Sequence, residues 1–212
     1  MSTINWHFYT DYTTKNIRNS TVLWKPYWHV LVDDFLHPDL LQLCNNQWPD
    51  MDIYANQDQP NTYNQHRKSY NPGVCNHEFW GDFYNNFVQS EDITDAIYSL
   101  EDLNKPELEP NSCSLWEDTE GYSVSNHVDG TTIHVAWQCY LTDDPLLEPY
   151  GTSLTDVGGK IHKQIPYKQN LCWIMRNDAY SYHKCTTVHD PVVRLSLMFR
   201  SIFQTSKFYA DE

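Results

Sequence analysis

Apolar residues in the first half of the chain recur every three or four positions, which is the spacing of amphipathic helices. The first such set follows Pro38 and consists of Leu40, Leu41, Cys44 and Trp48. Proline suits the first turn of a helix, because its missing N–H has no partner to lose there. The pattern therefore predicts a helix that begins near Pro38, after a short apolar strand from Trp28 to Val32.

The same spacing returns twice between residues 79 and 103. One set comprises Phe79, Trp80, Phe83, Tyr84 and Phe87. The other, from about Asp92 to Leu103, would bury Ile93, Ile97, Leu100 and Leu103. We therefore expect a helical support over residues 38–104, ending at a break from Lys105 to Pro110.

Two polar segments interrupt this pattern. Residues 1–20 are polar, and we expect them to form an N-terminal arm. Gln57 to Pro72 is rich in Asn, Gln, Tyr and Pro, which predicts a long loop. Loops of that length inside a compact domain are usually functional or mobile. Its side chains Tyr63, His66, Arg67 and Tyr70 could cover a substrate or simply pack on the surface.

After Asn111 the period changes from helical to two, which is the period of strands. The expected strands are Cys113–Glu117, Tyr122–Val128, Thr132–Leu141, Gly151–Leu154, Lys160–Gln164, Asn170–Met175, Tyr182–Val188 and Val192–Phe203. Turn signals such as Asp129-Gly130 and Gly158-Gly159 separate most of them. Strands in a row after helices favour a mainly β, α+β chain with a jelly-roll core, the double-stranded β-helix of cupin-like folds, over about residues 111–203.

Composition limits both the architecture and the partners. The 212 residues suit one domain, which we place at residues 21–212. Fourteen Lys and Arg against 28 Asp and Glu give a net charge of −14. Such a balance argues against nucleic acid and against an anionic membrane surface, since both attract basic proteins. No apolar stretch is long enough to span a bilayer.

The cysteines and the N-terminus bear on the compartment. The six cysteines include no C-x-x-C pair. The first residues lack the basic start and apolar run of a signal peptide. We therefore expect a cytoplasmic protein with reduced, mostly buried thiols. Cys185, two residues after His183, is expected to be a core thiol.

Candidate chemistry begins with His127 and Asp129, which stand two residues apart at the end of an expected strand. Side chains alternate along a strand, so both point to the same face. Two His and one carboxylate on one side of a metal ion, with positions left open, are the ligands of non-haem Fe(II) oxygenases. His183 is the best third ligand, because it begins another strand and stands 11 residues before Arg194. The alternative is that the three are unrelated polar residues at strand ends.

Arg194 and Ser196 also share one face of a strand, whereas Leu195 and Leu197 occupy the other. A buried arginine needs an anion, because an unpaired buried charge is very costly. A carboxylate ligand gripped by the guanidinium fork would meet that need, with hydroxyl donors from Ser196 and Tyr140. Two alternatives stay open: Arg194 pairs with an acidic side chain of the protein, and Tyr140 is a packed core residue.

These motifs resemble those of the 2-oxoglutarate- and Fe(II)-dependent dioxygenases, in the prolyl-hydroxylase-like branch of bacterial or phage type. The matching segments, in chain order, are Gly121-Tyr-Ser-Val124, His127-Val-Asp129, Tyr140-Leu141, Gly151-Thr-Ser-Leu154, Arg176-Asn-Asp178, His183 and Arg194-Leu-Ser196. The resemblance covers roughly residues 28–203, with the motifs confined to 121–196. It departs from animal prolyl hydroxylases in its short N-terminal half and in the Gln57–Pro72 loop.

The resemblance implies a set of roles. His127, Asp129 and His183 would bind Fe(II), and Arg194, Ser196 and Tyr140 would hold the far carboxylate of 2-oxoglutarate. With O2, such a site would hydroxylate an unactivated C–H bond while 2-oxoglutarate becomes succinate and CO2. Related halogenating enzymes have a small residue where this chain has Asp129, so hydroxylation is the better interpretation. Asn126 could orient a ligand from behind.

Two other functions are alternatives to this one. A non-catalytic metal-binding jelly roll would explain the scaffold, although it would not need a co-substrate clamp. A nucleic-acid demethylase is disfavoured by the charge of −14. The substrate is expected to be a peptide side chain of the prolyl type or a small metabolite.

Overall fold

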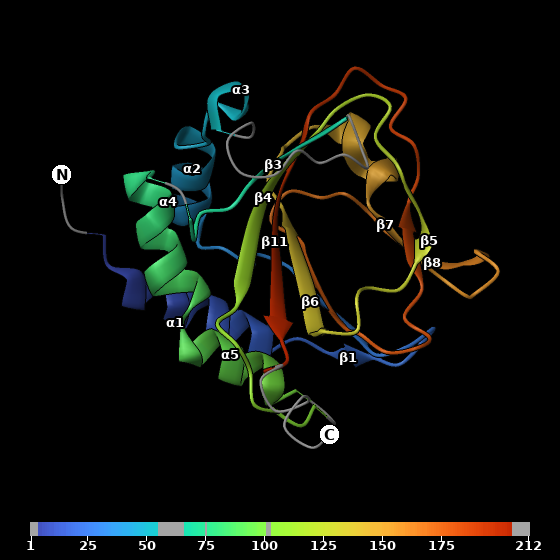
Figure 1. The fold of residues 1–212 in the computed structure, drawn as a ribbon, viewed down its shortest axis with the longest axis horizontal. Helices are drawn as coiled ribbons and strands as arrows, with labels where there is room; N and C mark the ends of the chain where they lie inside the picture. The colour runs from blue at the N-terminus through green and yellow to red at the C-terminus, as the bar shows by residue number, and fades with distance from the viewer. Residues whose placement is uncertain (1–3, 55–65, 75, 101–102, 205–212) are drawn as a thin grey trace, which may run out of the picture.

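The computed structural model describes residues 4–54, 66–74, 76–100 and 103–204. Two antiparallel sheets face each other, and helices cover the outer face of the larger sheet (Figure 1). In spatial order the larger sheet contains β1 (Val22–Leu23), β2 (His29–Val32), β9 (Cys172–Arg176), β6 (Ile133–Tyr140), β11 (Arg194–Ile202), β4 (Ser112–Asp118) and β3 (Arg67–Tyr70). The smaller sheet contains β5 (Val124–His127), β10 (His183–Cys185), β7 (Thr152–Thr155) and β8 (Ile161–Ile165).

This arrangement confirms the expected mainly β fold with a jelly-roll core. All eight strands expected after residue 111 are present, as β4 to β11. The helical elements are α1 (Trp6–Arg18), α2 (Pro38–Asn46), α3 (Met51–Tyr54), α4 (Glu78–Phe83), the π-helical turn η1 (Tyr84–Val88), α5 (Glu91–Tyr98) and the 3₁₀ helix η2 (Pro145–Tyr150). As expected, α2 begins at Pro38, and its Leu40 and Cys44 are fully buried.

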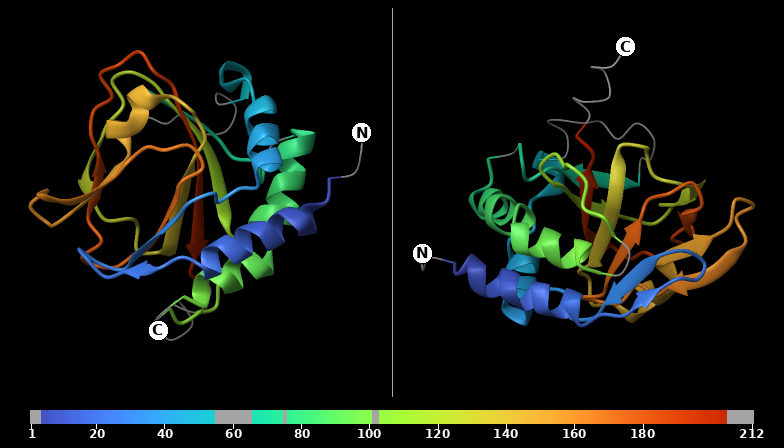
Figure 2. Two further views of the ribbon diagram at one scale, coloured as in Figure 1. Left: turned by 180° about the vertical axis from the view of Figure 1, so that it is seen from behind. Right: turned by 90° about the horizontal axis from the view of Figure 1, so that it is seen from below.

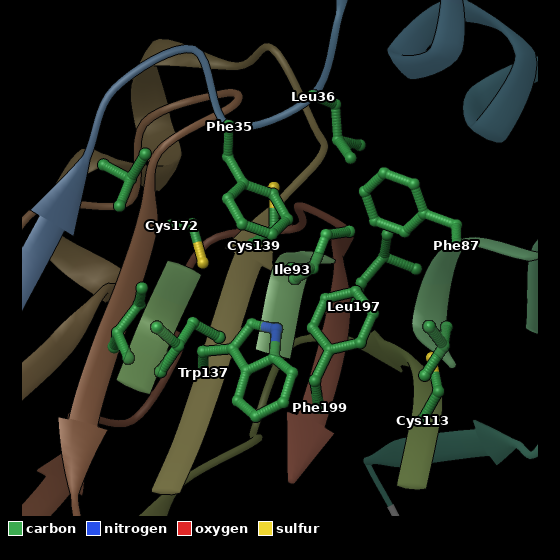
Figure 3. Close-up of a cluster of buried hydrophobic side chains, with 14 of the residues drawn as sticks. Phe35, Leu36, Phe87, Ile93, Cys113, Trp137, Cys139, Cys172, Leu197 and Phe199 are labelled. Carbon is green, nitrogen blue, oxygen red and sulfur yellow. The ribbon is translucent and has the colours of Figure 1, made fainter. Parts of the chain in front are cut away.

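The alternation along β11 divides the interior into two cores. Leu197 and Phe199 point toward the helices, where they pack with side chains such as Trp137 and Phe87 (Figure 3). Met198 points the other way, into a second core between the two sheets. Because residues 194, 196, 198 and 200 share the inner face of β11, this strand also supplies polar side chains to the space between the sheets.

The N-terminal segment differs from the expected polar arm. Residues 6–18 form α1, whose Ile17 is fully buried. Asn5 caps the helix by accepting a hydrogen bond from the backbone N–H of Phe8, and Thr13 donates from its hydroxyl to the carbonyl of Phe35 at 2.7 Å. The buried face of this helix consists mostly of threonines. Because threonine counts as polar in a hydropathy pattern, the sequence does not indicate that this face is buried. Figure 2 shows α1 running along the helical side of the molecule.

The expected loop from Gln57 to Pro72 is replaced in part by a strand. Residues 67–70 form β3, which pairs with β4 at the edge of the larger sheet. Residues 57–65 of the predicted loop, with Tyr63, lie outside the described residues. The last expected helix is also shorter than predicted, because α5 ends at Tyr98, although Leu100 and Leu103 are buried as expected. In the described part of the chain, no helix is long and apolar enough to cross a membrane.

His29 on β2 is fully buried, and we expect it to make the stability of the protein depend on pH. Its Nδ1–H donates to the carbonyl of Tyr27 at 2.8 Å, and its Nε2 lies 3.1 Å from the Lys163 ammonium, from which it can accept only when neutral. Burial lowers the pKa of His29 from 6.5, and the Lys163 charge lowers it further. A lowered folded-state pKa gives stability that is present above pH 6.5 and is lost as the pH falls below it.

We therefore expect the free energy of unfolding to fall more steeply below pH 6.5 in the wild type than in His29→Gln, which cannot be protonated. Urea denaturation of both proteins between pH 8 and pH 5 measures the two slopes. Equal slopes would contradict the assignment of this titration to His29.

Candidate metal centre and cavity

The smaller sheet brings His127 and His183 together. His127 ends β5 and His183 begins β10, and the two are direct partners in the antiparallel register. Asp129 follows in the turn after β5. The imidazole centroids lie 4.3 Å apart, and one ligand atom from each of the three side chains can be chosen so that all lie within 4.8 Å of one another. The structure thus places all three predicted ligands in one group.

The backbone fixes which nitrogen of each imidazole faces this group. Nδ1 of His127 lies 2.9 Å from the carbonyl of Ser125, and Nδ1 of His183 lies 3.0 Å from the carbonyl of Ser181. A carbonyl only accepts, so each Nδ1 carries the proton and each Nε2 keeps a lone pair. The Nε2 atoms lie 3.8 Å (His127) and 3.9 Å (His183) from Oδ1 of Asp129. Such second hydrogen bonds are typical of metal-bound histidines.

The electrostatics of the group also fit a cation. Oδ2 of Asp129 is buried and has no hydrogen-bond partner among the described residues, and a buried unpaired carboxylate oxygen is costly. Burial lowers the pKa of His183, which favours the neutral imidazole that a metal requires. The side chain of His127 is 37% exposed whereas that of His183 is 9% exposed, so the group is open on one side. Its nitrogen and oxygen donors are those of a non-haem Fe(II) site.

The open side faces a cavity of about 200 Å³ between the sheets. Besides the three candidate ligands, its lining comprises Arg67, Trp116, Tyr122, Val124, Gln138, Thr152, Trp173, Lys184, Cys185, Arg194, Met198 and Arg200. The volume exceeds by several-fold the roughly 30 Å³ that a water molecule occupies in the liquid. It can therefore admit a small organic acid beside a metal ion. Cys185, expected in the core, is buried but contributes to this wall.

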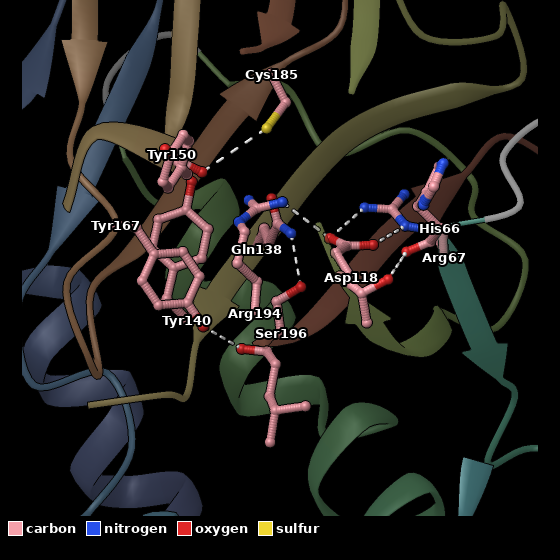
Figure 4. A network of polar contacts seen from close by, with 12 residues as sticks. His66, Arg67, Asp118, Gln138, Tyr140, Tyr150, Tyr167, Cys185, Arg194 and Ser196 are labelled. Carbon is pink, nitrogen blue, oxygen red and sulfur yellow. Dashed lines mark hydrogen bonds and ion pairs between the residues drawn. The ribbon is translucent and has the colours of Figure 1, made fainter. Parts of the chain in front are cut away.

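Arg194 reaches the cavity from the first position of β11 and is held by a carboxylate. Its Nη1 donates to Oδ2 of Asp118 at 2.9 Å, so the ion pair considered from the sequence does form. Arg67 grips the same carboxylate with two hydrogen bonds, of 2.6 Å to Oδ1 and 2.9 Å to Oδ2. The three residues stand side by side on β3, β4 and β11 (Figure 4).

One carboxylate between two guanidinium groups leaves a net positive charge. The side chains of Asp118 and Arg194 are 0% and 2% exposed, so water screens this charge poorly. Nε of Arg194 is buried and has no hydrogen-bond partner in the part of the chain that the structure describes. The ion pair with Asp118 therefore fixes the position of Arg194, while its Nε–H stays available as a hydrogen-bond donor. An anion in the cavity would complete its coordination.

The other two residues predicted to bind the co-substrate have protein partners. Ser196 accepts a hydrogen bond from Nε2 of Gln138 at 2.8 Å. The hydroxyl of Tyr140 lies 2.8 Å from that of Thr152 and accepts from Nε1 of Trp173 at 3.1 Å. Neither Ser196 nor Tyr140 lines the cavity, whereas Gln138, Thr152 and Trp173 do. Direct contact of Ser196 and Tyr140 with a ligand stays a prediction, and the structure shows them behind the wall.

Asn126, considered as a support for the ligands, bonds elsewhere. Its amide donates to the carbonyls of Asp156 and Val157 at 3.0 and 3.3 Å, and its oxygen accepts from the hydroxyl of Thr155. It therefore ties β5 to the turn between β7 and β8.

Several cavity residues were missed in the sequence. Arg67 lies in the segment predicted as a loop, and Asp118, which stands behind the lining residues Arg67 and Arg194, belongs to none of the motifs. A signal did exist for Arg200, because alternation along β11 puts it on the same face as Arg194 and Ser196. No comparable signal marks Asp118, whose role arises only when β3 and β11 flank β4.

Comparisons with known proteins agree with the fold. No protein-family model matches the sequence, and a search of curated proteins finds no significant match. Among solved structures, a prolyl-4-hydroxylase from Pseudomonas putida is similar with a TM-score of 0.62 and 15% identity, over 92% of this chain and 99% of that one. A prolyl hydroxylase from Trichoplax adhaerens, in complex with a peptide fragment of hypoxia inducible factor, gives a TM-score of 0.67 and 11% identity, over 100% and 99%.

A third similar structure contains ligands. HygX from Streptomyces hygroscopicus, with nickel and 2-oxoglutarate bound, has a TM-score of 0.59 and 9% identity, over 83% of each chain. At such identities the likeness shows the fold, and the fold is that of prolyl hydroxylases and 2-oxoglutarate–Fe(II) oxygenases.

Proposed function

We propose that the protein is a 2-oxoglutarate- and Fe(II)-dependent dioxygenase that hydroxylates an unactivated C–H bond. The observation that carries the proposal is the convergence of His127, Asp129 and His183 on one point at the mouth of a cavity whose wall contains Arg194. Three protein ligands on one side of a metal leave positions for a chelating co-substrate and O2. The nickel and 2-oxoglutarate held by HygX, on the same fold, support this interpretation.

In this proposal the chain's residues bind and orient. Each imidazole offers Nε2, because its Nδ1 is engaged with a backbone carbonyl. Asp129 supplies a carboxylate whose Oδ2 has no other partner. When bound, iron with 2-oxoglutarate would supply the oxidising chemistry, in which the co-substrate becomes succinate and CO2 while the substrate gains a hydroxyl group.

Arg194 is the proposed anchor of the far carboxylate of 2-oxoglutarate. It lines the same cavity as the three ligands, and its unpaired Nε is available to a carboxylate oxygen. Gln138 and Thr152 add polar groups to the wall. We place Ser196 and Tyr140 in supporting positions, since Ser196 bonds to Gln138 and Tyr140 to Thr152.

The substrate is proposed only as a class, a small molecule or a peptide side chain. The Trichoplax protein was solved with a peptide and HygX also with hygromycin B, so this fold serves both kinds. The alternative is a non-catalytic metal-binding jelly roll. The unpaired buried Nε of Arg194 favours the dioxygenase, because a protein that binds only a metal has no use for an anion site beside it.

The affinity for 2-oxoglutarate tests the anchor. With Mn(II) in place of iron, Arg194→Lys is expected to bind 2-oxoglutarate about tenfold or more weakly, because lysine keeps the charge but lacks the guanidinium fork. Isothermal titration measures this affinity. The matched control is Arg176→Lys, since Arg176 forms an ion pair with Asp178 and does not line the cavity. Equal affinities for all three proteins would remove Arg194 from the site.

A further inference from the structure

The cavity contains a second arginine, Arg200, that forms no ion pair with any residue the structure describes. Arg200 lies six residues after Arg194 on β11, on the same inner face, and lines the same cavity. Its register partners are Ser112 on β4 and Ala136 on β6, which carry no charge. Its guanidinium carbon lies 5.3 Å from the centroid of the Trp116 ring.

Within the described residues, the guanidinium of Arg200 has no hydrogen bond and no ion pair. In contrast, Arg67 and Arg194 both bond to Asp118. Burial lowers the pKa of Arg200, and the nearby charge of Arg67 lowers it further, whereas the carboxylate of Asp129 raises it. An arginine stays protonated even so, and the carboxylate that acts on it, that of Asp129, forms no ion pair with it and is a proposed ligand of the metal.

The charges of the cavity exceed what the proposed co-substrate can balance. Three arginine side chains line it, those of Arg67, Arg194 and Arg200, in a chain of net charge −14, whereas the ammonium of Lys184 donates to the carbonyl of Gly159. Among the described residues, the carboxylates opposed to them are that of Asp129, in the lining, and that of Asp118, which is outside the lining and pairs with Arg67 and Arg194. A divalent metal would add as much positive charge as the dianion 2-oxoglutarate removes. An excess of one positive charge remains, and Arg200 is the arginine that forms no ion pair.

We propose that Arg200 binds an anionic group, a carboxylate or a phosphate monoester, on the substrate that is hydroxylated. This rests on the proposed function and deepens it by giving the substrate a charge. Arg194 and Arg200 stand at opposite ends of the inner face of β11, so one can hold the co-substrate while the other holds the substrate.

The surroundings of Arg200 add a second feature to the substrate. Trp116, Tyr122, Val124 and Met198 give the cavity wall an apolar part beside the cations. Arg67 lies over the ring of Trp116 at 3.5 Å, so one face of this indole is covered by an arginine that is already paired. A compact ligand with an apolar body and one anionic end matches this combination.

Ligand-observed NMR titrations test the proposal with three probes that differ only in their head group. Benzoate carries a carboxylate, phenyl phosphate a phosphate monoester, and benzamide neither charge. The protein is loaded with Zn(II), which is redox-inert, and is titrated with and without saturating 2-oxoglutarate. We expect benzoate or phenyl phosphate, but not benzamide, to bind the 2-oxoglutarate-saturated wild type.

Three variants locate that binding. Arg200→Gln is expected to weaken the anionic probe about tenfold, the loss of one charge-assisted contact, while its affinity for 2-oxoglutarate stays within about twofold of wild type. Arg200→Lys should retain part of the probe affinity. Arg176→Gln, which removes the same charge outside the cavity, should bind the probe as the wild type does.

The outcomes separate this proposal from the proposed function. The proposal about Arg200 is overturned if neither anion binds to the wild type saturated with 2-oxoglutarate. It is also overturned if Arg200→Gln binds the anionic probe with the same affinity as the wild type. Loss of 2-oxoglutarate affinity in Arg200→Gln would assign Arg200 to the co-substrate instead and overturn it too. If the wild type does not bind 2-oxoglutarate at all, the proposed function fails. In that case, if an anionic probe binds in the titration without 2-oxoglutarate and Arg200→Gln weakens this binding, Arg200 belongs to an anion site that does not serve a dioxygenase.

Discussion

Asp129→Ala is expected to lower the affinity for Fe(II) by more than 100-fold and to raise or leave unchanged the stability of the metal-free protein. Replacing a residue that merely supports a metal ligand typically costs about 10–100-fold, and Asp129 is itself a proposed ligand. In the metal-free protein the carboxylate of Asp129 lowers the stability of the fold, because its Oδ2 is buried and has no hydrogen-bond partner among the described residues. Removing it relieves a cost on the order of 1–3 kcal/mol.

Anaerobic metal titration and urea denaturation of the metal-free protein measure the two effects. The control is Asp33→Ala, whose carboxylate forms an exposed ion pair with Lys168 and should change both quantities little. A metal-free Asp129→Ala protein that is much less stable than the wild type would indicate a structural role for the carboxylate. Unchanged iron affinity would exclude Asp129 as a ligand.

The second large effect is expected at Asp118. Asp118→Asn should destabilise the protein by about 3–5 kcal/mol, because two buried guanidinium groups lose their shared counter-charge. The side chains of Asp118, Arg194 and Arg67 are 0%, 2% and 11% exposed, so water compensates little. The affinity for 2-oxoglutarate should fall as well, since Asp118 fixes the position of Arg194.

Urea denaturation with a double-mutant cycle measures this network. Arg67→Gln should be less harmful in the Asp118→Asn background than in the wild type, because it removes one of the uncompensated charges. Asp95→Asn serves as the control, since its ion pair with Lys105 is exposed and should contribute less than about 1 kcal/mol. An Asp118→Asn protein as stable as the wild type would contradict the ion-pair account.

The sequence predicted the strands well, because alternation and turn residues are local signals. All eight strands after residue 111 were placed, and so were the helices beginning near Pro38 and Phe79. The errors fall where tertiary contacts override the pattern. Residues 6–18 form a helix whose buried positions are mostly threonines. Residues 67–70 form a strand rather than a loop, because they pair with the edge of β4, a contact that the local sequence does not indicate.

The candidate site divides in the same way. His127, Asp129, His183 and Arg194 could be chosen because spacing of two fixes a common face and because the family motifs match. Asp118 could not be found, since its importance comes from lying between Arg67 and Arg194 in neighbouring strands. Spacing puts Ser196 on the cavity side, but it cannot reveal that Gln138 stands in front of it.

The central claim, that one cavity binds Fe(II) and 2-oxoglutarate together, is tested most directly by an anaerobic titration of the wild type followed by visible absorption. Iron chelated by the keto acid end of 2-oxoglutarate should give a weak charge-transfer band, which neither compound alone produces with the protein. We predict this band at one equivalent of each. Iron that binds tightly without giving the band would leave a metal-binding jelly roll, and no iron binding would contradict the site of His127, Asp129 and His183.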